Sequence, residues 1–322
     1  MNSENSTPSE NEKINIWSQE AAQQQVDDER KLARKPTKPR WGIRHAVYAF
    51  LASLVLQSVV TIPFLIIETA NLASKGTLDP AKYQAQVTAS LLSGPGLFFA
   101  QISMYVAWFG VGIYVTYRLG LHSFIKDFWF RFKWVQDISL GILLAVSLRI
   151  LEAISFWIFG LLGLNLAGAD NSTPFTQSSG IWSGLLLFGV VSIVGPISEE
   201  FLFRGLLLQG LIRTFRRRTF LPRTGFGATI QRISPKTFAG FVKYKEFLFR
   251  HKYVLAVIIS ALAFGSMHFQ GTQTFGQWLV VIETGFIGLV FAIVVLKTRR
   301  LGLTIVAHMV FNFSAIALAL WF

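Results

Sequence analysis

The chain of 322 residues contains no cysteine, and it has only 17 acidic residues and five histidines. The absence of cysteine excludes disulfide bonds, thiolate metal sites and cysteine nucleophiles. Charged residues make up only 15% of the chain and hydrophobic residues 52%, which is too apolar for a soluble protein of this length. The composition therefore indicates a membrane protein, in which the few carboxylates and histidines are the first candidates for chemistry.

Lysine and arginine outnumber the acidic residues and give a net charge of +13. Such a charge can indicate a nucleic-acid partner, but basic loops in a multi-span protein more often follow the positive-inside rule. The basic residues gather in residues 1–40, 118–136, 213–252 and 297–300. We therefore expect membrane lipids around the chain, no nucleic-acid partner, and a cytoplasmic N-terminus.

Apolar runs recur along the chain and reach the roughly 20 residues that a helix needs to cross a hydrocarbon core. They predict an all-α fold, a polytopic membrane helix bundle with about seven or eight transmembrane helices. The expected spans are residues 46–67, 97–117, 138–164, 253–267, 275–296 and 301–322, together with a longer apolar stretch at 180–212.

The stretch at 180–212 contains Gly195-Pro196, which predicts a kink or break in the helix. Proline removes one helical hydrogen bond and its ring clashes with the preceding turn. The sequence leaves open whether the two halves cross the membrane separately, and the number of spans depends on this point.

Three regions follow from these patterns. Residues 1–40 are polar and then basic, which indicates a disordered cytoplasmic tail. Residues 41–137 hold the N-terminal transmembrane segments and an aromatic, basic loop at 118–136 that we expect to lie along the lipid headgroups. Residues 138–322 contain the polar side chains that interrupt apolar runs.

Two adjacent glutamates, Glu199 and Glu200, interrupt an apolar stretch. A charged side chain inside a membrane span costs about 2.5–3.5 kcal/mol, so it is kept only with a partner or a function. Arg204 follows Glu200 by four residues and lies on the same helical face, where a structural ion pair can form. Glu199 has no such local partner and is therefore the residue that most strongly suggests chemistry.

Three further polar residues fall at membrane depth in two later spans. At a rise of 1.5 Å per residue, Glu199 lies roughly 20 Å, His268 roughly 22 Å and His308 roughly 12 Å from the basic side. Asn312 lies one turn deeper than His308. Intramembrane polar groups almost always face the bundle interior, so we expect these side chains to converge in a site that opens toward the cytoplasm.

The residue types at this site allow several kinds of chemistry. Glu199 with His268 can activate water, and His308 with Asn312, on one helical face, can donate hydrogen bonds to an oxyanion. The glutamates and histidines can instead bind a divalent metal such as zinc. Taken singly, a histidine can be a packing residue and Asn312 can join two helices. A transport or proton-relay site also stays open at this point.

Three motifs, in order along the chain, resemble those of the CPBP family of membrane proteins. They are Glu199-Glu200-x-x-x-Arg204, Phe264-Gly-Ser-Met-His268 and His308-Met-Val-Phe-Asn312. The family groups CAAX prenyl-protein endopeptidases with bacterial Abi and bacteriocin-processing proteins. The resemblance covers roughly residues 138–322 and implies a CPBP-type intramembrane endopeptidase with its catalytic membrane core in this region.

The resemblance also implies a role for each motif residue. Glu199 and His268 would activate water, Glu200 and Arg204 would support the site, and His308 and Asn312 would form the oxyanion hole. The family is often labelled metalloprotease, although a metal-free glutamate mechanism has also been argued. If a metal such as Zn²⁺ is bound, its ligands would come from Glu199, Glu200, His268 and His308.

The resemblance leaves the substrate broad: a membrane-associated or secreted peptide or protein. The lack of cysteine and the Abi-like character point to a bacterial cell membrane, where prenylated CAAX proteins are not expected. The alternative is a non-proteolytic membrane protein for bacteriocin self-immunity or scaffolding. A transporter would also suit a broken helix at Gly195-Pro196, but the inverted repeat typical of that design is missing.

Overall fold

The computed structural model describes residues 23–24, 39–76, 82–83, 86–87, 95–169, 182, 184–216, 243–244, 246–269, 271 and 274–321. Every regular element within these ranges is a helix, so the all-α fold expected from the sequence is confirmed. The expected tail at 1–40 and the basic loop at 213–252 lie largely outside the described residues.

The first helices are α2 (Ile43–Ser74), α4 (Pro95–Leu119), α5 (Phe124–Phe128) and α6 (Trp134–Leu161). A central segment follows, formed by η1 (Leu185–Val194), α9 (Gly195–Glu200), η2 (Phe201–Leu208) and α10 (Gln209–Arg216). The last helices are α13 (Lys252–Ser266), α14 (Phe275–Thr298) and α15 (Gly302–Trp321). By length and composition, α2, α4, α6 and α14 could each cross a membrane, and α13 and α15 are shorter apolar helices. These findings agree with a helical membrane bundle.

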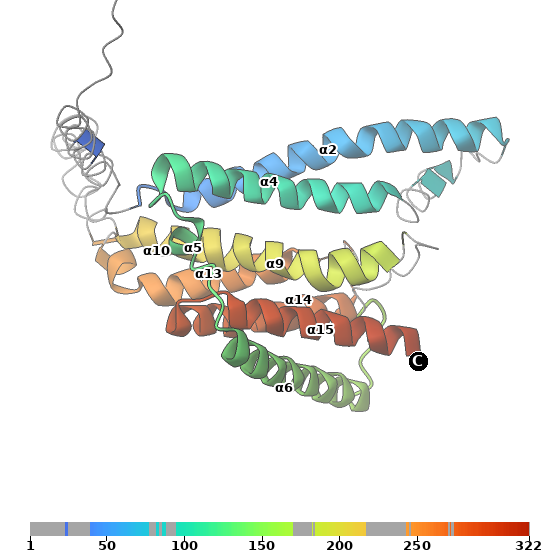
Figure 1. Cartoon of the computed structure of the whole chain (residues 1–322). Coiled ribbons are helices and arrows are strands. Elements are labelled where there is room, and N and C mark those ends of the chain that lie inside the picture. The colour runs from blue at the N-terminus through green and yellow to red at the C-terminus, as the bar shows by residue number, and fades with distance from the viewer. Residues whose placement is uncertain are drawn as a thin grey trace, which may run out of the picture.

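The long helices lie side by side, with α2 and α4 on one flank and α6 on the other (Figure 1). Helix α15 packs on α6, which is distant from it in sequence, and α13 packs on α14, the next helix along the chain. The central segment runs between the flanks and contacts α2, α4, α13, α14 and α15. Because helices from both halves of the chain surround this segment, its charged side chains can be shielded from lipid.

The central segment stays helical through Gly195 and Pro196, so the break that the sequence allowed there does not occur. Val194 and Gly195 keep right-handed helical dihedrals, with φ/ψ of −69°/−39° and −57°/−59°. The turns before and after α9 have π geometry, and the Gly195 N–H bonds to the oxygen of Val190, five residues back. A π turn is wider than an α turn, so the helix accommodates the proline ring locally. The described residues thus form one segment and not two half-helices.

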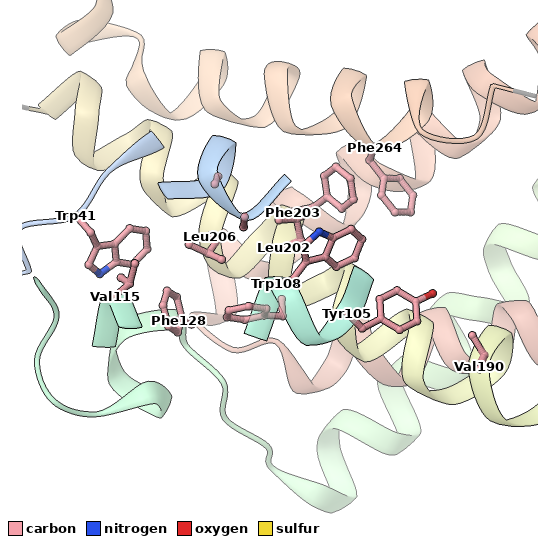
Figure 2. Packing of buried hydrophobic residues seen from close by; sticks show 13 residues of the cluster. Trp41, Tyr105, Trp108, Val115, Phe128, Val190, Leu202, Phe203, Leu206 and Phe264 are labelled. Atoms are coloured by element: carbon pink, nitrogen blue, oxygen red, sulfur yellow. The ribbon is translucent and has the colours of Figure 1, made fainter. Parts of the chain in front are cut away.

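An aromatic cluster fixes the central segment against α4 and α5 (Figure 2). Phe201 stacks on Phe109 with ring centroids 4.7 Å apart and meets Phe128 edge-on at 5.0 Å. Gly112 faces the same ring, and a Cβ there would lie 2.3 Å from a carbon of Phe201. Only glycine therefore lets α4 approach this closely.

The aromatic loop at 118–136 was expected along the headgroups, and the structure corrects this in part. Phe128 is fully buried, while Phe124 and Phe130 pack against the aromatic cluster. Trp134, at the start of α6, is 71% exposed and keeps the expected outward position. Sequence composition could not separate the two groups, because an aromatic ring suits both a protein core and a membrane interface.

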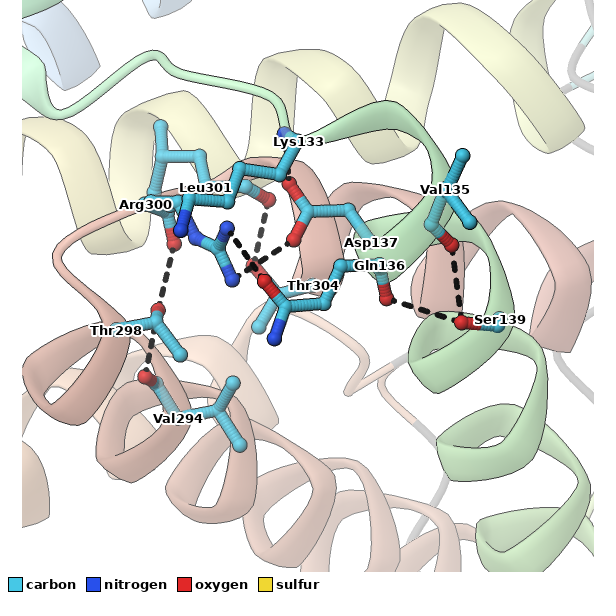
Figure 3. Close-up of polar contacts among 10 residues, drawn as sticks. All are labelled: Lys133, Val135, Gln136, Asp137, Ser139, Val294, Thr298, Arg300, Leu301 and Thr304. Carbon is cyan, nitrogen blue, oxygen red and sulfur yellow. Dashed lines mark hydrogen bonds and ion pairs between the residues drawn. The ribbon is translucent and has the colours of Figure 1, made fainter.

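A buried carboxylate fastens the start of α15 to the start of α6 (Figure 3). Asp137 accepts a 2.7 Å hydrogen bond from the Lys133 N–H and pairs with Arg300 at 3.1 Å. The Gly302 N–H donates to the oxygen of Arg131 at 3.1 Å, and a Cβ on Gly302 would lie 2.4 Å from the Asp137 carboxylate. These contacts set the position of α15, the helix that carries His308 and Asn312.

A second charged contact ties α6 to α15 within the apolar layer. Arg149 pairs with Glu152, which follows it by three residues and lies on the same helical face. Its guanidinium also donates to the Phe311 oxygen at 2.6 Å and to the Ser314 hydroxyl at 3.2 Å, and it lies 3.8 Å from the Phe311 ring centroid. The charges thereby gain the partners that an intramembrane ion pair needs.

Candidate active site

Helix α9 places Glu199 and Glu200 in different surroundings. Successive residues of a helix point about 100° apart, so the two carboxylates leave the central segment in different directions. The Glu200 side chain is 0% exposed, whereas the Glu199 side chain is 21% exposed. The pair therefore consists of one sealed carboxylate and one that water or a substrate can reach.

The sealed carboxylate of Glu200 pairs with Arg204, as the four-residue spacing predicted. Arg204 Nη1 lies 2.8 Å from Glu200 Oε1, and both side chains are fully buried. The guanidinium also donates to the Gly288 oxygen on α14 at 3.3 Å and lies 4.3 Å from the ring centroid of Phe264 on α13. Removing either charge would strand the other in an apolar interior, so this pair holds three helices together.

His308 lies between the two glutamates. Its Nδ1 is 3.4 Å from Glu200 Oε1, and its Nε2 is 3.8 Å from Glu199 Oε2. Thr304, one turn earlier on α15, also faces the Glu200 carboxylate. Helix α15 thus turns the polar side chains of Thr304 and His308 toward α9. Of these two, His308 is the one that lies next to Glu199.

His268 lies just beyond the end of α13 and interacts electrostatically with Glu199 and His308. Its Nδ1 lies 2.9 Å from the Phe264 oxygen. A carbonyl oxygen only accepts, so Nδ1 carries the proton, and the neutral ring keeps Nε2 as an acceptor. Gln277 on α14 donates to the His268 backbone oxygen at 3.1 Å and fixes this turn. Within the described residues Nε2 has no hydrogen-bond partner, so this ring nitrogen can accept a hydrogen bond from water or substrate.

The side chain of Asn312 contacts the backbone of the central segment. Its Nδ2 donates a 2.9 Å hydrogen bond to the oxygen of Val191. The Val191 oxygen would normally accept from the N–H four or five residues later. The Gly195 N–H donates to the Val190 oxygen instead, and Pro196 has no N–H. Asn312 supplies the missing donor. An amide nitrogen has two N–H groups, and the second remains for another acceptor.

The predicted metal ligands do not form a metal site as they are placed. In the part of the chain that the structure describes, no three His, Cys, Asp or Glu side chains could together hold a metal ion. Arg204 lies 2.8 Å from Glu200 Oε1 and would repel a cation at that oxygen. As they are placed, these residues therefore do not fit a bound metal.

Two residues near the glutamates were missed by the sequence analysis. Thr304 precedes His308 by four residues on one helical face, so its position carried a signal that could have found it. Tyr105 lies in α4, outside the region of the motifs. Its hydroxyl and Glu199 Oε1 are 3.1 Å and 3.7 Å from the point where a Cβ on Gly195 would lie. No spacing rule links α4 to α9, so only the fold reveals this neighbour.

Comparison with known proteins bears on the same region. A family model described as type II CAAX prenyl endopeptidase, Rce1-like, matches residues 181–314. This range includes all six residues that the motifs singled out, and the match confirms the resemblance to the CPBP and CAAX protease family. The matched range, 181–314, is narrower than the range 138–322 expected from the motifs. Searches of curated proteins and of solved structures found no match.

Proposed function

We propose that this chain, whose residues 181–314 are similar to the Rce1-like endopeptidases, is an intramembrane endopeptidase that hydrolyses a membrane-associated or secreted peptide or protein. The observation that carries the proposal is the position of His308 between the accessible Glu199 and the sealed Glu200. Two carboxylates in such different surroundings can serve one reaction in different roles.

In the proposed reaction Glu199 is the general base. It removes a proton from water, and the water oxygen attacks the carbonyl carbon of the scissile peptide bond. The C–N bond then breaks, and Glu199 returns the proton to the leaving amine. His268 assists by accepting a hydrogen bond at Nε2, the ring nitrogen that its contact with Phe264 leaves free.

His308 and Asn312 are the proposed donors to the oxyanion. His308 presents Nδ1 to Glu200 Oε1 at 3.4 Å and Nε2 to the Glu199 side of the site, and in the proposed reaction an N–H at Nε2 donates to the reacting oxygen. Asn312 offers the N–H that Val191 does not use. Removing one oxyanion donor typically lowers kcat by about 100- to 1000-fold, so each should be measurable.

The Glu200–Arg204 pair supports the site without entering the reaction. Its complete burial excludes direct contact with water, and its links to α13 and α14 hold the helices that carry His268. We also propose that the end of the bundle with Arg131, Lys133 and Arg300 faces the cytoplasm, because basic residues favour that side. A bacterial cell membrane is proposed from the sequence alone.

The test compares wild-type protein with Glu199→Ala and His268→Ala in otherwise identical cells. Glu246→Ala is a matched control, because Glu246 is an exposed glutamate whose partner is Arg250 on the same helix. Immunoblotting of membrane fractions confirms equal protein levels. The N-termini of membrane and secreted peptides are then profiled by mass spectrometry.

The proposal expects new N-termini in cells with wild-type protein and with Glu246→Ala, and their loss with Glu199→Ala and His268→Ala. The cleaved peptides then identify the substrate. Identical profiles in all strains would refute proteolysis. If a bacteriocin-immunity phenotype were kept in the Glu199→Ala strain, the non-proteolytic scaffold would be the better interpretation.

A further inference from the structure

Tyr105 is a buried tyrosine whose ring and hydroxyl have different neighbours. The residue is 6% exposed, and its ring packs against Trp108 with centroids 5.4 Å apart. In Figure 2 the ring lies at the edge of the aromatic cluster, with its hydroxyl turned away from Trp108. Helix α4 therefore holds the ring by packing and presents the hydroxyl toward the central segment, which it contacts at η1 and α9.

The hydroxyl and the Glu199 carboxylate share one small volume beside Gly195. A Cβ on Gly195 would lie 3.1 Å from Tyr105 Oη and 3.7 Å from Glu199 Oε1. Glu199 also acts electrostatically on Tyr105. The opposite oxygen, Oε2, is the one that faces His308 at 3.8 Å. Tyr105 and His308 therefore approach different oxygens of the Glu199 carboxylate.

The Tyr105 hydroxyl has no hydrogen-bond partner among the described residues. The Nδ2 of Asn312 is engaged with Val191, and the Nδ1 of His268 is engaged with Phe264. A tyrosine hydroxyl within the protein usually finds a partner. A free phenol beside the accessible carboxylate is therefore available to a small polar molecule such as water.

Gly195 keeps this volume open. Any side chain there would meet the Val190 oxygen at 2.9 Å and the Tyr105 hydroxyl at 3.1 Å. These distances are shorter than an ordinary carbon–oxygen contact, so even alanine would force the phenol or the backbone to move. A glycine four residues before Glu199 thus leaves space on the helical face that Glu199 occupies.

We infer that Tyr105 is a further catalytic residue, which holds the attacking water against Glu199 Oε1. The inference rests on the proposed endopeptidase function. The water donates one hydrogen bond to Glu199 and the other to Tyr105 Oη, which leaves an oxygen lone pair directed at the substrate carbonyl. Tyr105 keeps its own proton throughout, and the proton removed from water still passes to Glu199 and then to the leaving amine.

The test uses the full-length protein in lipid vesicles and a synthetic peptide that spans a cleavage site defined by the N-terminal profiling. Tyr105→Phe removes only the hydroxyl and keeps the ring that packs on Trp108. Tyr114→Phe is the matched control, because Tyr114 lies in the same helix and is 58% exposed. Initial rates give kcat and KM, and thermal unfolding checks that each variant is folded.

Tyr105→Phe should lower kcat by about 100-fold through misplaced water, with KM and the unfolding temperature unchanged. Tyr114→Phe should match the wild type. Wild-type kinetics in Tyr105→Phe, together with inactive Glu199→Ala, would overturn the inference and leave the endopeptidase function standing. A fall in kcat that parallels a lower unfolding temperature would assign Tyr105 a packing role and also overturn it. No cleavage by the wild type would end both proposals.

Discussion

The side-chain amide of Asn312 takes the place of a backbone N–H for Val191, at a distance of 2.9 Å between Nδ2 and the carbonyl oxygen. Pro196, five residues after Val191, is the residue that would otherwise donate in a π turn. The proline in the first motif region and the asparagine in the third are thus physically linked. This link explains how the central segment stays helical through Gly195-Pro196.

Asn312→Ala should destabilise the protein by about 1–3 kcal/mol, because a partly buried carbonyl loses its donor. Pro196→Ala restores a backbone N–H at the required position, so the double variant should be more stable than the two single effects predict. Thermal unfolding in detergent of all four proteins measures this coupling. Strictly additive effects would contradict the link, and recovery of stability without activity would support the oxyanion role of the second N–H.

Breaking the buried ion pair should cost more than removing it. Arg204→Met leaves Glu200 charged in a sealed interior and should destabilise the protein by about 3–5 kcal/mol. Glu200→Gln combined with Arg204→Met removes both charges and should recover part of that loss. Unfolding in detergent gives the stabilities. Full activity in the double variant would show a purely structural pair, while equal loss in single and double variants would contradict the stability argument.

Helices α13 and α14 should tolerate no side chain at Gly265. A Cβ there would lie 2.6 Å from the Val281 oxygen and 2.9 Å from the Cα of Gly285. Close approach through small residues is a main source of helix association in membranes. Gly265→Ala should therefore destabilise the protein by about 1–3 kcal/mol and displace His268, three residues later.

The control for Gly265→Ala is Gly110→Ala in α4, where a Cβ would meet no atom within 4 Å. This substitution should be neutral or stabilise the helix by up to about 1 kcal/mol. Unfolding temperatures of both variants, with cleavage assays, check the comparison. Equal stability of the two variants would show that α13 and α14 are not in close contact.

Asp127 lies outside the membrane spans, and its carboxyl should make the free energy of unfolding depend on pH. Burial raises the pKa of its carboxyl, and the effect is opposed by hydrogen bonds from the Leu121 N–H and Trp41 Nε1 and by the charge of Arg213. A raised pKa in the folded state means tighter proton binding there. The resulting stability is present below the unfolded pKa of about 3.9 and is lost as pH rises through the folded pKa.

Asp127→Asn stays neutral and should not show this loss. As the pH is raised from about 3.5 toward neutrality, the unfolding temperature of the wild type should therefore fall relative to that of Asp127→Asn. Thermal unfolding of both proteins across this range measures the shift. A difference that stays constant with pH, or that moves in favour of the wild type, would contradict the prediction.

Local rules were enough to predict much of this protein from its sequence. The lengths of the apolar runs determined the helices, because a helix satisfies its backbone hydrogen bonds within one segment and lipid offers no alternative. The spacing of Glu200 and Arg204 predicted their ion pair, because residues four apart share a helical face.

Only the tertiary structure decided which side chains of different helices meet. His308 lies between two glutamates, Asn312 serves Val191, and Tyr105 approaches Glu199, yet each contact depends on how a helix is rotated and shifted against its neighbour. Lipid-facing and core-facing surfaces are both apolar in a membrane bundle, so hydropathy carries little information about that rotation. The sequence predicted a kink or break at Pro196 and could not reveal that the segment stays helical, because the donor that replaces the missing N–H is Asn312 on another helix.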